Sequence, residues 1–198
     1  MVRGKEPGGF DFTAAMRRLC DDFCRRLPDL RHIDFDRVAL GFCQTRQPVQ
    51  HGIQATLTPL RFEQGSLTTR RRGRTWTIDR LVDQSGREFL YVLRFYLPRF
   101  LDLPLDEKLI TVVHELWHIS PAFDGDLRRH PGRCYAHSTS QAAYDAAMAV
   151  LVDKWRRLDP PPELYEFLGY RFLELQARHG AIRGHKIRVP RLRPLDAA

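Results

Sequence analysis

LITVVHELWHI, residues 109–119, is the stretch that decides how the rest of the chain is interpreted. It contains the pattern H-E-x-x-H, from His114 to His118, inside an apolar segment. Pro104 suits the first turn of a helix, so we expect a helix that begins around Pro104 and stops near Ser120. Two histidines four residues apart then lie on one helix face, where both imidazoles can bind the same cation.

Zinc suits this pair, because imidazole is a good ligand for a borderline-soft ion with tetrahedral geometry. Glu115 could accept a proton from a water bound to the ion, whose pKa the metal lowers to about 7. The pattern therefore predicts a catalytic zinc site with His114 and His118 as ligands and Glu115 as general base. The simpler alternative is a pair of histidines on the polar face of a core helix.

A catalytic zinc site needs a third protein ligand and an open fourth position. The segment after the helix supplies His130, across a turn, and His137, just before the next predicted helix. We expect His130 to be the ligand, with His137 as the alternative. A carboxylate such as Asp145, on that following helix, is a third alternative.

Peptide hydrolysis also needs a hydrogen-bond donor for the developing oxyanion, commonly Tyr, His or Arg. Arg128 and Tyr135 are the candidates by their position in the sequence. Arg128 could instead form a salt bridge with Asp124 or Asp126 and shape the loop. Those two carboxylates could equally orient a ligand imidazole.

The stretch Ile110–His130 resembles the metallopeptidases found in phages and in related prokaryotic proteins. Their pattern is HELxHI, a proline, an aromatic with a glycine, then L-R-x-H. It reads here as His114-Glu115-Leu116, His118-Ile119, Pro121, Phe123, Gly125, Leu127-Arg128 and His130. The resemblance implies a zincin-like zinc peptidase with His114, His118 and His130 as ligands and Glu115 as base. The SprT-like proteases, which cleave protein crosslinked to DNA, are more distantly similar. The chain departs from them because it has no C-x-x-C pair for a C-terminal zinc ribbon.

Outside the motif, apolar residues at helical spacing predict helices over residues 11–27, 139–157 and 162–178. Alternating residues predict strands at 37–44 and 52–62, and a hairpin of 75–82 with 88–97 around the turn signal DQSG. A sheet followed by helices is typical of an α+β fold. We expect one compact, minimal zincin-like domain over residues 1–198. It would contain a small antiparallel-containing sheet, an N-terminal helix, the H-E-x-x-H helix and two C-terminal helices. A basic tail would begin at about residue 179.

The charge of the chain is unevenly distributed. Lys and Arg number 32 against 24 Asp and Glu, which gives a net charge of +8. Arg70, Arg71, Arg72 and Arg74 crowd together, at or near a loop before the predicted hairpin, and residues 178–193 hold six basic residues and no acid. Such clusters can bind the phosphates of nucleic acid. The alternative is a solvated hairpin tip and a loose basic end.

Other features indicate where the protein works. No apolar run approaches the roughly 18 residues that span a bilayer, and the N-terminus lacks the apolar stretch of a secretory signal. The four cysteines form no C-x-x-C pair, which favours reduced thiols. We therefore expect a cytoplasmic protein that acts on a protein or peptide substrate and not at a membrane.

Two rival functions remain open from the sequence. In the first, His114, His118, Cys134 and His137 close a structural zinc site in a nucleic-acid-binding module. In the second, the chain is an inactive zincin that binds a partner. Against the first, Glu115 would then have no role, and the Cys134–His137 spacing matches zinc fingers poorly.

Overall fold

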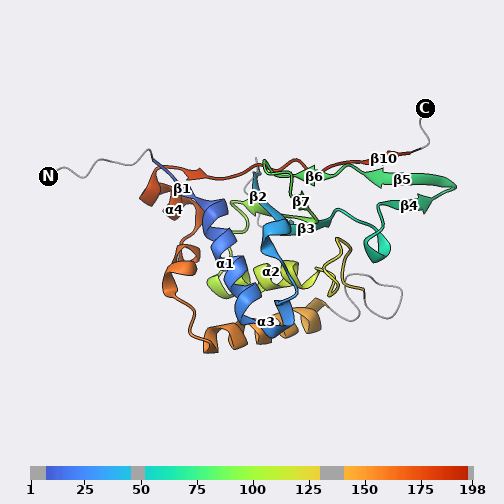
Figure 1. Ribbon diagram of the computed structural model, residues 1–198. Coiled ribbons are helices and arrows are strands. Elements are labelled where there is room, and N and C mark those ends of the chain that lie inside the picture. The colour runs from blue at the N-terminus through green and yellow to red at the C-terminus, as the bar shows by residue number, and fades with distance from the viewer. Residues whose placement is uncertain (1–7, 46–51, 130–140, 196–198) are drawn as a thin grey trace.

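The computed structural model describes residues 8–45, 52–129 and 141–195 and confirms the α+β class (Figure 1). The helices among these residues are α1 (Phe12–Arg26), α2 (Leu105–Trp117), α3 (Gln141–Arg157) and α4 (Phe172–His179). The strands are β1 (Phe10–Asp11), β2 (Val38–Gln44), β3 (Ala55–Pro59), β4 (Thr68–Arg71), β5 (Arg74–Ile78), β6 (Leu81–Val82), β7 (Glu88–Phe89), β8 (Tyr91–Leu97), β9 (Ile182–Arg183) and β10 (Leu192–Pro194). None of the helices in the described ranges has the length and apolar character that crossing a bilayer requires.

The central sheet has the strand order β2-β8-β3. β8 runs parallel to β2 and antiparallel to β3, with Leu93 opposite both Leu40 and Leu57. β8 is buried on both faces, with Leu93 and Phe95 in the main core and Val92 against Ile187 and Val189, which explains its nearly continuous apolar sequence. Within the described residues β3 pairs with β8 alone, so β3 forms an edge of this sheet.

The predicted hairpin of 75–82 with 88–97 is wrong in its partners. Only β6 and β7 pair across the DQSG turn, with Leu81 opposite Phe89. β5 pairs instead with β4 and β10, and β8 pairs with β2 and β3. Alternation in the sequence identified strand segments, but it carries no information about which distant strand each segment joins.

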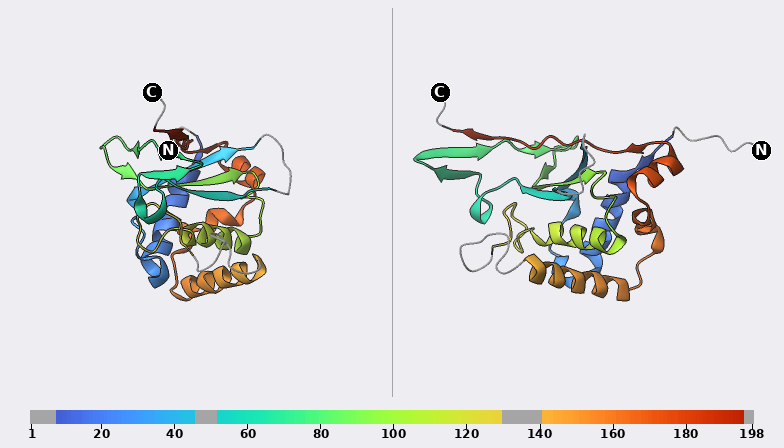
Figure 2. Two further views of the ribbon diagram at one scale, coloured as in Figure 1. Left: turned by 90° about the vertical axis from the view of Figure 1, so that its right-hand side faces the viewer. Right: turned by 180° about the vertical axis from the view of Figure 1, so that it is seen from behind.

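Helices cover one face of the central sheet (Figures 1 and 2). α2 lies between the sheet and α3, and α1 crosses beside them. The ring of Phe12 on α1 packs edge-on against Phe95 of β8 at 6.0 Å. Trp155 of α3 lies 4.3 Å from the Phe23 ring of α1 and donates its indole N–H to Asp22 at 2.7 Å. The core therefore joins elements from both halves of the chain.

The H-E-x-x-H helix, α2, begins directly after Pro104 and ends at the cap residue His118, as the sequence predicts. Lys108 on this helix is only 2% exposed and donates to the carbonyl oxygens of Leu168 at 2.7 Å and Tyr170 at 2.9 Å. Burial lowers the pKa of this lysine to about 8. These bonds fix the C-terminal part of the chain to α2.

The same bonds explain why the predicted helix over 162–178 is wrong for its first half. That segment forms two short 3-10 turns, at Pro162–Leu164 and Glu166–Gly169, and α4 begins only at Phe172. The Leu168 and Tyr170 carbonyls bond to Lys108 rather than to an α-helical N–H four residues later. The predicted stop at Gly180 is confirmed, because Gly180 caps α4 with a φ of 81°.

The basic C-terminal segment is built into the fold, so the predicted loose end is wrong for β9 and β10, although their basic side chains are exposed. β9 pairs in parallel with β1, and β10 pairs antiparallel with β5. Between them, the carbonyl of His185 accepts the N–H of Phe42 in β2 at 3.0 Å. In Figure 1 this red segment runs along the top of the molecule, above the central sheet.

Candidate active site

His114 and His118 lie one turn apart on α2, with ring centroids 4.8 Å from each other. Tyr144, near the start of α3, packs against both. Its ring centroid lies 4.8 Å from that of His114 and 5.9 Å from that of His118, stacked with the latter. The structure thus brings the two predicted ligands together on one face and covers that face with an aromatic side chain.

Asp145 follows Tyr144 on α3 and lies beside the first histidine. Its Oδ1 atom is 3.6 Å from Nδ1 of His114, and its side chain is 45% exposed. That distance is longer than a hydrogen bond but within the range of an ion pair. A carboxylate here could orient the imidazole so that the other ring nitrogen faces a metal, or could itself bind the metal.

The side chain of Glu115, on α2, points toward strand β3. This side chain is 9% exposed, and burial raises the pKa of its carboxyl from 4.5 to about 7. The backbone N–H of Leu57 donates to the carboxylate and opposes the rise. A group with a pKa near the working pH can both take and return a proton, which suits a general base.

A cleft of about 700 Å³ opens at this place. One wall comes from the segment 52–55 that leads into β3, and the other from the face of α2 that carries Glu107, Thr111 and His114. Glu115 and Asp145 also line the cleft. Its volume lies within the range of small-molecule binding sites.

Arg128, a predicted oxyanion donor, lies at the end of α2. Its Nε donates to the carbonyl of Trp117 at 2.7 Å, and its guanidinium stacks over the Trp117 ring at 4.0 Å. Its backbone N–H donates to the carbonyl of His118 at 2.7 Å. The alternative salt bridge of Arg128 with Asp124 or Asp126 is wrong, because Arg129 pairs with Asp126 instead, at 2.8 Å.

The predicted role of Asp124 and Asp126 in orienting an imidazole is not seen among the described residues. Asp124 accepts the backbone N–H of Asp126 at 3.1 Å, and the Asp126 carboxylate holds Arg129. The loop is further fixed by Tyr91, whose hydroxyl donates to the Asp126 carbonyl and accepts from Gly125 N–H. Both carboxylates therefore shape the loop that returns the chain to α2.

His130, Cys134, Tyr135 and His137 lie outside the described residues. Described residues before and after that segment contact the histidine pair: the Arg128 N–H donates to the His118 carbonyl, and the Tyr144 ring packs against both imidazoles. Within residues 8–45, 52–129 and 141–195, no group of three or more His, Cys, Asp or Glu is placed to hold a metal ion. The described part of the site thus provides two imidazoles, and the identity of the third ligand stays a prediction.

Tyr144 is the site residue that sequence reasoning missed. Helical spacing assigns it only to the buried side of α3, which is correct, since it is 9% exposed. Burial raises the pKa of its hydroxyl, with Arg128 opposing and Glu115 and Asp145 adding to the rise. A phenol that stays protonated can donate a hydrogen bond. Helical spacing did not separate Tyr144 from Met148, Leu151 and Trp155, which the same pattern places on that side of the helix.

No family model, curated protein or solved structure matches this chain. The resemblance to phage-type metallopeptidases therefore stays a prediction from the motif.

Proposed function

We propose that this chain is a zinc-dependent peptidase. The observation that carries the proposal is the grouping of His114 and His118 on one turn of α2, with Glu115 buried beside His114 at a cleft. The two imidazoles are donors of the kind that zinc prefers, and their ring centroids lie 4.8 Å apart. The third donor would come from His130 or His137, or from Asp145, which lies 3.6 Å from His114.

Zinc, when bound there, would supply a Lewis acid that polarises the scissile carbonyl and acidifies a water. The protein groups have separate tasks. Glu115 would take the proton of the attacking water and return it to the leaving amine. The hydroxyl of Tyr144 or the guanidinium of Arg128 would donate a hydrogen bond to the oxyanion. Arg128 bonds to the end of α2, and the Tyr144 ring stacks on His118 there.

A peptide substrate fits the strand that borders the cleft. The N–H of Leu57 is bonded to Glu115 and therefore points away from β8, toward the edge that β3 forms among the described residues. An extended peptide can add to such an edge through main-chain hydrogen bonds. Its backbone would then pass beside Glu115 and His114. We therefore favour peptide bonds as the substrate class.

The rival structural zinc site makes a different use of the same histidines. It needs Cys134 and His137 as further ligands and leaves no position open to water. It gives no role to a carboxylate that is buried in a cleft beside the two imidazoles. An inactive zincin that binds a partner would keep the cleft but show no hydrolysis.

The variant Glu115→Gln tests the peptidase proposal. It is nearly isosteric and removes only the proton acceptor, so the rate of peptide hydrolysis should fall by about 10²–10⁴ with zinc occupancy unchanged. Glu107→Gln is the matched control, since Glu107 lies on the same helix, lines the same cleft and is exposed. The assay offers unfolded casein and peptide libraries with and without a chelator. Equal chelator-sensitive activity in wild type and Glu115→Gln would contradict the proposal.

A further inference from the structure

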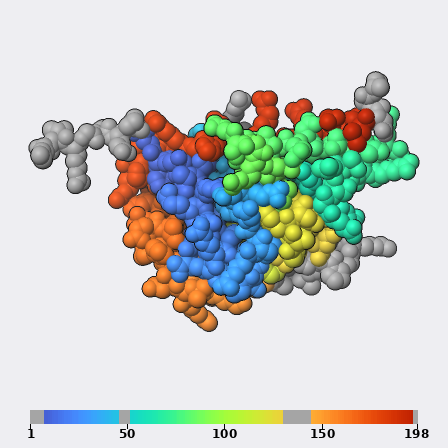
Figure 3. Space-filling view, in the orientation of Figure 1, coloured from blue at the N-terminus to red at the C-terminus, as the bar shows by residue number. Residues whose placement is uncertain are grey.

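The hairpin β4–β5 carries the arginine cluster on a tight turn, not in a loop before a hairpin as the sequence suggested. Arg71 pairs with Arg74, so only Arg72 and Gly73 form the loop. Both have positive φ, 50° and 77°, which is the conformation of a type I′ turn. Such a short turn holds the surrounding side chains at nearly fixed positions. Figure 3 shows the hairpin projecting at one end of the molecule.

The charges of this hairpin are not neutralised by neighbours. Residues 66–78 contain no acid, and Arg70, Arg71, Arg72 and Arg74 are all exposed. Among the described residues none of these four forms an ion pair, whereas nearby Arg80 pairs with Glu88 and Arg193 with Asp79. Exposed cations without an acidic partner create a positive potential that attracts polyanions.

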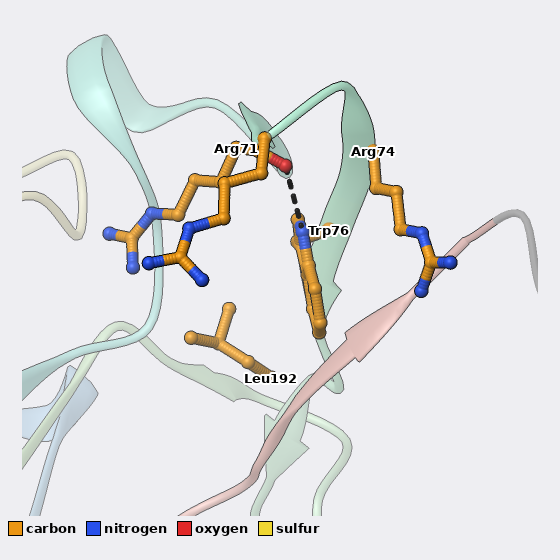
Figure 4. Close-up of a pocket in the computed structure, with 5 residues that line it drawn as sticks. Arg71, Arg74, Trp76 and Leu192 are labelled. Atoms are coloured by element: carbon orange, nitrogen blue, oxygen red, sulfur yellow. Dashed lines mark hydrogen bonds between the residues drawn. The ribbon is translucent and has the colours of Figure 1, made fainter.

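An aromatic side chain lies among these arginines. Trp76 lies two residues after Arg74 on β5 and opposite Thr69 on β4, so it shares a sheet face with Arg71 and Arg74. Its indole N–H donates to the Arg71 carbonyl at 3.4 Å. With Arg72 and Leu192 of β10, these residues line a hollow of about 600 Å³. Figure 4 shows Arg71 to one side of the indole and Arg74 to the other.

We propose that this face binds single-stranded nucleic acid, with a base in the hollow against Trp76 and the flanking phosphates on Arg71, Arg72 and Arg74. A partly exposed aromatic ring between guanidinium groups matches the two components of single-strand binding, stacking and charge. A duplex keeps its base faces covered, so it could use the arginines but not the hollow. An acidic peptide could use the charges, but it offers no base to stack on Trp76. The proposal is independent of the peptidase site, because none of these residues lines the catalytic cleft.

The test measures binding of a fluorescent oligothymidine strand to the full chain by anisotropy, beside a duplex of equal length and a polyglutamate of equal charge. We expect the single strand to bind most tightly and to quench tryptophan fluorescence. Trp76→Ala should weaken binding about 5–100-fold, and Trp76→Phe should keep most of the affinity, because a ring remains for stacking. The Phe variant and urea unfolding show whether a loss comes from misfolding.

The arginines are tested by salt dependence. Removing one arginine that neutralises a phosphate should reduce the slope of log affinity against log salt by about 0.7, so Arg71→Ser with Arg74→Ser should reduce it by about 1.4. Arg25→Ser is the matched control, since that exposed arginine lies on α1 and pairs with Asp21. No binding at about 50 mM salt, equal binding of polyglutamate, tighter binding of the duplex, or an unchanged affinity in Trp76→Ala would each overturn the proposal.

Discussion

The end of α2 and the tip of the β4–β5 hairpin both concentrate polar groups, but they differ in burial. Glu115 is 9% exposed between a helix and a strand, and that burial moves its pKa to about 7. The hairpin arginines lie at the surface without acidic partners among the described residues. Burial therefore changes the acid–base chemistry of Glu115. Exposure leaves the hairpin arginines with an attraction for anions that salt weakens.

Two arginines show the same contrast within one residue type. Arg128 donates to the Trp117 carbonyl and stacks on the Trp117 ring, so its guanidinium holds the end of α2. Arg71 contributes its backbone carbonyl to Trp76 but keeps its guanidinium in the hollow. Substitution of Arg128 should therefore change the local structure at the end of α2. Substitution of Arg71 should instead change the affinity of the hollow for its ligand.

The largest effect should come from the two histidines of α2. His114→Ala or His118→Ala should each weaken zinc binding by about 3–5 kcal/mol, since a complete zinc site contributes about 10–16 kcal/mol. Competition with a chromophoric chelator measures the loss. His185→Ala, which lies on the C-terminal segment, should leave the zinc content unchanged. Full zinc occupancy in either α2 variant would show that the metal site is elsewhere.

A comparison of His130→Ala with His137→Ala identifies the third ligand. We expect the first to weaken zinc binding nearly as much as His118→Ala and the second much less. The reverse ranking would assign the ligand to His137. Small and equal losses in both would point to the Asp145 carboxylate. The same chelator competition measures all three variants.

The buried Glu115 makes the stability of the metal-free protein depend on pH. A carboxyl whose pKa is raised from 4.5 to about 7 on folding stabilises the fold most below pH 4.5, and that stability is lost as the pH rises through 7. The metal-free Glu115→Gln variant does not lose this stability as the pH rises, because glutamine does not titrate. Its free energy of urea unfolding should exceed that of wild type by about 3 kcal/mol at about pH 8. At about pH 4 the two proteins should nearly coincide, and a constant difference at all pH values would contradict the assignment.

Asp145 is expected to have a smaller effect, through His114. If its carboxylate orients the imidazole, Asp145→Asn should weaken zinc binding by about 10–100-fold, because an amide orients the ring less well. A loss as large as that of His118→Ala would make Asp145 a ligand instead. No change in zinc affinity or rate would remove it from the site.

The smallest effect should come from the hairpin. Arg71→Ser with Arg74→Ser should change the free energy of unfolding by less than about 0.5 kcal/mol, because exposed side chains without ion pairs contribute little. Urea unfolding measures this difference. A decrease above about 1 kcal/mol would show that these guanidinium groups support the fold rather than a binding surface.

Local patterns in the sequence predicted the helices that periodicity defines, namely α1, α2 and α3, and the pairing of His114, Glu115 and His118 within one turn. They did not predict contacts between distant segments. Three features depend on partners far along the chain: the parallel pairing of β2 with β8, the antiparallel pairing of β10 with β5, and the 3-10 turns before α4. Tyr144 was missed for the same reason, since its contact with the histidines joins two helices.

The measurement that tests the central claim most directly is a crystal structure of the zinc-loaded protein, with anomalous scattering at the zinc edge. We predict one zinc ion held by His114 and His118 at about 2.0–2.1 Å, with one further protein ligand and a coordination position open to the cleft. We also predict that Glu115 lies beside that position without binding the ion. Zinc bound away from α2, or closed by four protein ligands including Cys134, would contradict the peptidase site.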